Sequence, residues 1–238
     1  DQYTPLQNYL LDMANDLVGH SLERPLDFAF HAKELWHGEG FFPRDNWNRD
    51  ERLRILGHLA DIPQKFHLPI IYSCVERRNY PPKNPPEGSP KRSFSAAQAR
   101  ANKKCHTICF LSCLAQVDRW MEHKYRDEKV FTIVELHDRH KNDLLTIAQL
   151  FSNPRARSTI ENDPNITWPP LTHIVEEPLF VRKSGSSPMQ VADVCAFILA
   201  RALAGAEHSE PLLEKIRPNL VSGFRREFVT TSSRGQPS

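Results

Sequence analysis

One apolar helix with a single carboxylate constrains this chain more than any other feature. The stretch SSPMQVADVCAFILARAL, residues 186–203, is apolar on nearly every face of a helix, and Asp193 lies in its middle. Ser187 followed by Pro188 marks the start of that helix. Burying a charge is costly unless another group compensates it. Asp193 therefore either forms an ion pair or a bond to a neighbouring helix terminus, or it has a metal-binding or catalytic role.

Carboxylates at the end of a strand are the partners that a metal-binding Asp193 requires. The run VFTIVELHD is rich in β-branched residues and ends in Glu135 and Asp138. Sites in α/β sheets gather at the carboxyl ends of strands. We therefore predict Asp138, Asp193 and Glu135 as metal ligands, with Gln190, three residues before Asp193, on the same helix face. We predict Gln190, Ser184 and Ser187 as substrate-binding or supporting residues. The alternative for Glu135 is an ordinary solvated strand end.

A second cluster, His31 and Glu34 in FAFHAKEL, follows another predicted strand. Together with Asp138 and Asp193 these residues form the predicted catalytic set. Oxygen-rich sets of this kind suit hard divalent cations, so we predict Mg²⁺ or Mn²⁺ as the cofactor. Two-metal phosphodiester hydrolysis needs carboxylates that are distant in sequence and close in space. The sequence contains no GxxxxGK[ST], GxGxxG, GxSxG or HExxH motif.

The composition indicates where the protein is located but does not identify its partners. The net charge of +2 neither requires nor excludes nucleic acid. No apolar run approaches the ~20 residues of a membrane span, so we predict no membrane association. Cys105, Cys109 and Cys113 recur every four residues along one predicted helix. Reduced cysteines packed in a core, and hence a cytoplasmic location, are the expectation.

Helices and strands alternate along the chain, which predicts an α/β fold with a sheet flanked by helices. Helical spacing predicts helices over 4–18, 49–66, 94–124, 137–151, from 188 onward, and 209–216. Strand-like runs cover 26–31, 68–76, 129–136 and 171–176. We predict a single domain over 1–228 with a Pro-rich loop inserted at 79–93, and a disordered tail at 229–238.

The end of the chain resembles the C-terminal signature of the domain-of-unknown-function family 3800. The shared pattern is S-x-x-S-x-x-Q-x-A-D-V, found here at Ser184, Ser187, Gln190, Ala192, Asp193 and Val194. The stretches FTIVELHD and FHAKEL are similar to the middle motifs of that family. The resemblance extends over roughly residues 1–205.

This resemblance implies a ribonuclease H-like mixed sheet flanked by helices and a metal-dependent nuclease, in a setting of phage defence or mobile elements. It implies that Asp193 is the carboxylate of the closing helix, that Asp138 ends a central strand, and that His31 lies near the site. The Asp-Glu-Ser motif that opens the family has no counterpart here. The resemblance therefore leads us to expect that this strand was removed or is disordered, or that the protein has lost it.

Two functions from different classes remain open at this point. The first is a divalent-metal-dependent nuclease or phosphodiesterase acting on nucleic acid. The second is a non-catalytic binding or regulatory module in which Asp193 pairs with a cation and the loop at 79–93 faces a partner. The segment KRSFSAAQARANKK, 91–104, carries basic side chains that suit a phosphate backbone, and its alternative is the solvated start of a long helix.

Overall fold

The computed structural model describes residues 2–18, 25, 27–76, 91–136, 141–152 and 171–221. These residues fall into two compact units. Unit 1 holds the described residues up to 70 together with 133–136 and 180–221, and unit 2 holds those within 71–132 and 137–179. The single domain over 1–228 stays a prediction.

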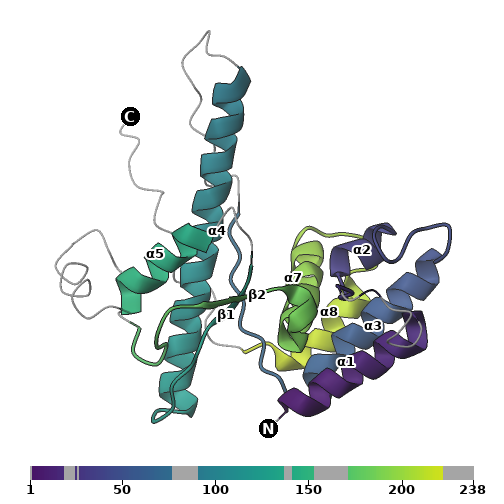
Figure 1. The fold of residues 1–238 in the computed structure, drawn as a ribbon, viewed down its shortest axis with the longest axis horizontal. Coiled ribbons are helices and arrows are strands. Elements are labelled where there is room, and N and C mark those ends of the chain that lie inside the picture. Colours follow the sequence, from purple (N-terminus) through teal and green to yellow (C-terminus); the bar gives the residue numbers. More distant parts are fainter. Residues whose placement is uncertain are drawn as a thin grey trace. The chain divides into compact units, whose positions relative to one another are not determined.

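Unit 1 is a group of helices around one apolar core (Figure 1). Its helices are α1 (Tyr3–Val18), α2 (Ala32–His37), α3 (Arg49–Lys65), α7 (Ser187–Leu203) and α8 (Glu210–Ile216). Helix α3 packs against α2, α7 and α8, and α7 also packs against α1. Ile55 of α3, Val194 of α7 and Ile216 of α8 are fully buried where these helices meet. The helices predicted for this part of the chain are confirmed, apart from shifts of a residue or two at their ends.

Local sequence signals explain where these helices begin and end. Asn48 caps α3 in a reciprocal arrangement with Glu51, since each side chain accepts from the backbone N–H of the other residue. Ser186, one residue before the predicted cap, caps α7 by accepting from the backbone N–H of Met189. Helix α2 ends at Gly38, whose φ of 71° favours glycine.

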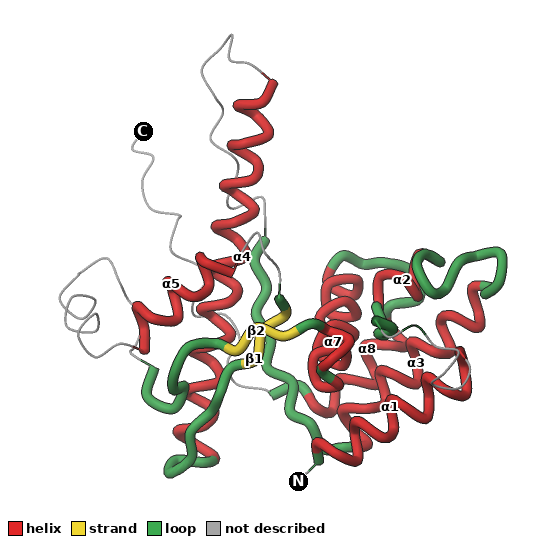
Figure 2. The backbone as a smooth tube through the Cα atoms, in the orientation of Figure 1, coloured by secondary structure: helices red, strands yellow, loops and turns green. Residues whose placement is uncertain are grey.

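The sheet is much smaller than the sequence predicts (Figure 2). It has two strands, β1 (Ile133–Glu135) and β2 (Leu179–Val181), which run parallel. Next to it, the N–H of Leu136 donates to the carbonyl of Val181 at 2.8 Å. Two isolated parallel bridges, Ile70 with Leu220 and Val130 with Ile174, complete the described β-pairing.

The predicted ribonuclease H-like mixed sheet flanked by helices is therefore wrong for the described residues, which are mainly helical. The runs 68–76, 129–136 and 171–176 have strand-like composition, yet most of their residues find no neighbouring strand. The predicted strand at 26–31 is extended at 28–31 without joining a ladder. None of the described helices is both long and apolar enough to cross a membrane.

Unit 2 is organised around one long helix, α4 (Lys91–Lys124), with α5 (Lys141–Ser152) packed against it (Figure 1). Leu114 and Ala115 of α4 form a small core with Leu171 and Ile174. Helix α4 begins before the predicted start at 94, so the predicted loop at 79–93 is wrong at 91–93. Positions 79–90 of that loop and the predicted tail at 229–238 lie outside the described residues.

Candidate functional site

Helix α7 binds the extended segment before α2 through two of its side chains. Oε1 of Gln190 accepts from the backbone N–H of Phe30 at 3.0 Å, and Oδ2 of Asp193 accepts from that of Ala32 at 3.1 Å. Residues three apart share a helix face, and alternate N–H groups of an extended chain point the same way. The two side chains thus take the place of a neighbouring strand.

A lysine that the sequence analysis missed joins the predicted residues together. The Nζ of Lys183, in the 3₁₀ helix η2 (Lys183–Gly185), lies 2.9 Å from Oδ1 of Asp193. It also lies 3.1 Å from Nδ1 of His31 and 3.5 Å from Oε2 of Glu135. We call Lys183, His31, Glu135 and Asp193 the Lys183 cluster. Since an ammonium can only donate, Nδ1 of His31 is the acceptor and its ring proton is on Nε2.

Solvent reaches the carboxylates of this cluster but hardly reaches its cation. The side chain of Lys183 is 8% exposed, whereas those of Asp193 and Glu135 are 30% and 44% exposed. The buried ammonium compensates the charge of Asp193, and the N–H of Ala32, the first residue of α2, satisfies its other oxygen. Asp193 thus has both structural partners that the sequence left open, an ion pair and a bond at a helix terminus.

The structure separates Glu34 from the other predicted catalytic residues. Its Oε2 accepts from the N–H of Phe41 at 3.2 Å and lies against Gly40, in the turn that follows α2. We assign Glu34 to that turn rather than to the Lys183 cluster. Asp138, predicted as both ligand and catalytic residue, lies outside the described residues. The predicted supporting residues Ser184, Ser187 and Gln190 line a cavity beside α7.

The Lys183 cluster offers donors that suit a divalent cation, although a cation already lies among them. Asp193 and Glu135 supply two carboxylates, which Mg²⁺ and Mn²⁺ accept, whereas the imidazole of His31 is a ligand that these ions do not prefer. In the part of the chain that the structure describes, no three His, Cys, Asp or Glu side chains form a group that could hold a metal. A divalent ion would therefore have to replace the ammonium of Lys183 between the carboxylates.

Composition alone does not distinguish Lys183 from other cations near Asp193 in the sequence. Arg182, Lys183 and Arg201 all lie within the same stretch. Arg201 instead contacts Nε2 of His37 at 2.7 Å and lies over the ring of Phe197. The available signal was the requirement for a partner to Asp193, and only the fold selects which of the cations satisfies it.

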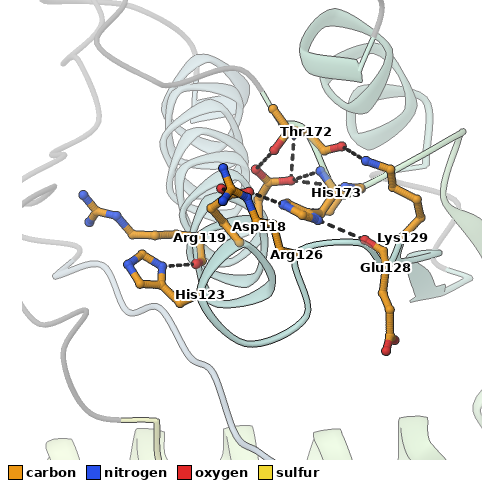
Figure 3. Close-up of polar contacts among 10 residues, drawn as sticks. Asp118, Arg119, His123, Arg126, Glu128, Lys129, Thr172 and His173 are labelled. Atoms are coloured by element: carbon orange, nitrogen blue, oxygen red, sulfur yellow. Dashed lines mark hydrogen bonds and ion pairs between the residues drawn. The ribbon is translucent and has the colours of Figure 1, made fainter.

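Unit 2 contains a second polar group that the sequence analysis did not single out (Figure 3). Oδ1 of Asp118, on α4, accepts from the backbone N–H groups of Thr172, His173 and Ile174 at 2.8, 2.6 and 3.1 Å. Its Oδ2 accepts from the hydroxyl of Thr172. We call Asp118, Glu122, Thr172 and His173 the Asp118 cluster. It fixes a segment distant in sequence onto α4, which is a structural role.

The imidazole of His173 is enclosed by acceptors on both sides. Its Nδ1 lies 2.9 Å from the carbonyl of Glu128 and its Nε2 lies 2.7 Å from Oε2 of Glu122. The bond to the Glu128 carbonyl, and then that to Glu122, raise the pKa of His173 above its ordinary value. The same hydrogen bond lowers the pKa of Glu122. With both nitrogens engaged, His173 has no free nitrogen with which to act on a substrate.

Of the five cysteines, Cys74 is exposed, and three of the others, Cys109, Cys113 and Cys195, are poor nucleophiles. Cys105 and Cys195 are buried, while Cys109 and Cys113 are half-buried. Burial raises the pKa of Cys113 to about 11 and that of Cys195 to about 12, and it also raises the pKa of Cys109. Because the thiolate is the reactive form, these side chains are inert near neutral pH.

Comparison with known proteins identifies no relative of this chain. No family model, no curated protein and no solved structure matches the chain.

Proposed function

We propose that the chain is a divalent-metal-dependent nuclease or phosphodiesterase that acts on nucleic acid at the Lys183 cluster. One observation supports it above the others. His31, Glu135 and Asp193 were chosen from three separate stretches of sequence, and all three contact the same ammonium. The predicted carboxylate Asp138 would join them, and Mg²⁺ or Mn²⁺ and a cytoplasmic location belong to the same proposal.

Each group of the cluster has a definite task in this proposal. Asp193 and Glu135 supply the carboxylate oxygens that would hold the metal, which when bound activates water and stabilises the leaving oxygen. The ammonium of Lys183, released from between them, binds a non-bridging phosphate oxygen as a compact positive charge. His31, with its ring proton on Nε2, donates a hydrogen bond to the departing oxygen, and water supplies the proton that this oxygen takes up.

The first test is cleavage of labelled single-stranded and double-stranded RNA and DNA with Mn²⁺, Mg²⁺ or chelator. We expect metal-dependent cleavage, which Asp193→Asn lowers at least about a hundredfold because it removes a charged ligand. The asparagine keeps an acceptor for the N–H of Ala32. The matched control is Asp61→Asn, which breaks the 2.7 Å ion pair of Asp61 with Lys215 in the same unit. Equal cleavage by wild type and Asp193→Asn would contradict the assignment of Asp193 as a metal ligand.

A second candidate, a non-catalytic binding or regulatory module, is favoured by a different observation. Both oxygens of Asp193 already have partners within the protein, so the fold does not require a metal there. The exposed basic side chains of Arg100, Lys103 and Lys104 on α4, within the segment 91–104, are what such a module would present to a phosphate backbone.

Thermal unfolding with and without Mn²⁺ separates the two candidates. A metal site that binds only the folded chain raises the melting temperature as Mn²⁺ is added. The enzyme predicts this increase in wild type and its loss in Asp193→Asn. The binding module predicts the same melting temperature for wild type with and without Mn²⁺.

A further inference from the structure

A cavity beside the start of α7 is a feature that the proposed chemistry does not use. Its volume is about 220 Å³, and it lies within unit 1 between α1 and the N-terminal turn of α7. Leu10 and Ala14 of α1 form one wall, and Phe28 and Phe30 form another. A cavity of about 150 Å³ already admits a molecule the size of benzene. The space therefore suits one flat ring system.

The remaining wall is polar and carries an unused hydrogen-bonding group. Ser184, Ser187 and Gln190 line it. Ser187 is 8% exposed, and its hydroxyl makes no hydrogen bond to the described residues. A hydroxyl that reaches the cavity can donate one hydrogen bond and accept two. A ligand with ring nitrogens or carbonyl oxygens would satisfy it.

The chain connects this cavity directly to the Lys183 cluster. Phe30 lines the cavity, while its neighbour His31 contacts Nζ of Lys183. The backbone at His31 is extended, with φ of −111° and ψ of 114°, so the two side chains point to opposite sides. Likewise Ser184 lines the cavity while Lys183 forms the cluster. In each of these two pairs of adjacent residues, one residue lines the cavity and the other belongs to the Lys183 cluster. The cavity therefore lies next to the cluster.

We propose that this cavity takes one unstacked nucleobase of a strand whose phosphate lies at the Lys183 cluster, so that the substrate is single-stranded nucleic acid. The inference rests on the proposed function and deepens it. The apolar wall of the cavity contacts the base, and the hydroxyl of Ser187 bonds its edge. A base inside a duplex is stacked and paired, so it enters only after unstacking, which costs energy.

The test compares the binding of three probes to the full chain in chelator, where no cleavage occurs. The probes are a short fluorescein-labelled oligothymidylate, a strand of the same length made of abasic sites, and the matching duplex. All carry phosphates for the cluster, but only the first offers free bases. We expect the oligothymidylate to bind about tenfold more tightly than the other two, the size of one stacking contact.

Gly185→Leu tests the cavity separately from the Lys183 cluster. Gly185 lines the cavity, a Cβ built on it meets no atom within 4 Å, and its φ lies outside the range that favours glycine. Leucine there fills the space without strain, and we expect it to remove the preference for the oligothymidylate. The control is Ala200→Leu, which adds the same side chain on the exposed face of α7. Ser187→Ala, which keeps the space and removes the hydroxyl, should lose only part of the preference.

The outcomes separate this inference from the proposed function. Equal binding of the oligothymidylate and the abasic strand to wild type overturns the inference, as does a preference that survives in Gly185→Leu. Metal-dependent cleavage accompanied by either result leaves the nuclease in place without a base site. A preference lost in Gly185→Leu and kept in Ala200→Leu supports the cavity, whether or not Asp193→Asn alters cleavage.

Discussion

Asp193 in unit 1 and Asp118 in unit 2 are both carboxylates on packed helices, and the fold stabilises their charges in different ways. Each lies on a helix and accepts hydrogen bonds from the backbone of a segment distant in sequence. Asp118 is nearly buried, and all its observed partners are neutral donors fixed by the fold. Asp193 has one such donor, and a lysine supplies the rest of its stabilisation.

This difference separates a structural carboxylate from one that is available for chemistry. The donors to Asp118 cannot leave without unfolding the segment that contains them. The side chain of Lys183 can rotate away from Asp193, and solvent reaches Asp193 and Glu135. A buried aspartate is therefore a candidate for function when its counter-charge can be exchanged for a ligand.

The largest expected effect is at Asp118. Asp118→Ala leaves three backbone N–H groups without an acceptor, so we expect the free energy of unfolding to fall by about 3 kcal/mol. Asp118→Asn keeps an oxygen at the position of Oδ1, which accepts all three N–H groups, and should cost about 1 kcal/mol. Urea denaturation measures both. The control is the exposed Asp127, where alanine should change stability by less than about 0.5 kcal/mol. A loss no larger for Asp118→Ala than for Asp127→Ala contradicts the structural role.

The next effect is at Lys183. Lys183→Met keeps most of the buried side chain and removes the charge that compensates Asp193. We expect a loss of about 2 kcal/mol, less than for a fully buried pair because both carboxylates reach solvent. If the cluster accepts a cation in place of the ammonium, Mn²⁺ should raise the melting temperature of this variant more than that of wild type.

Lys215→Met is the matched control for that experiment. It breaks the ion pair with Asp61, whose two side chains are 39% and 44% exposed, so the loss should be about 0.5 kcal/mol. Mn²⁺ should act on this variant as it does on wild type. Equal responses of the Lys183→Met and Lys215→Met variants to Mn²⁺ would show that the Lys183 cluster does not prefer a metal.

The helices were predictable because their signals are local, whereas the strands were not. Apolar spacing located α1, α3, α7 and α8, since one face of each helix is buried. The run 129–136 has a composition typical of strands, but a ladder also needs a partner, and only Ile133–Glu135 has one in β2. The backbone N–H groups of Phe30 and Ala32 donate to side chains of α7 instead, which no strand pattern reveals.

The sequence indicated His31, Glu135 and Asp193 of the Lys183 cluster but not the lysine itself. A lone carboxylate in an apolar helix indicated Asp193, and polar residues at the ends of extended runs indicated His31 and Glu135. Glu34 follows the same pattern, yet a local turn uses its carboxylate. Lys183 and His173 have no distinctive spacing, because their roles depend on contacts between segments that are distant in sequence.

The smallest effect in this comparison is the pH dependence of the Asp118 cluster. Hydrogen bonds raise the pKa of His173 above 6.5, so its stabilising contribution is complete below that value and is lost as pH rises through the pKa of the folded chain. The pKa of Glu122 is lowered from 4.5, so its contribution is lost at acidic pH. We therefore expect the midpoint of urea unfolding to be lower at pH 8.5 than between pH 5 and 6. Solvent screens the exposed Glu122, which keeps the effect small.

Glu122→Gln should reduce this difference between pH 8.5 and pH 5 to 6, since it removes the charge that favours protonated His173. Lys215→Met, in the other unit, should leave it unchanged, and an equal reduction in both variants would assign the pH dependence to groups other than His173.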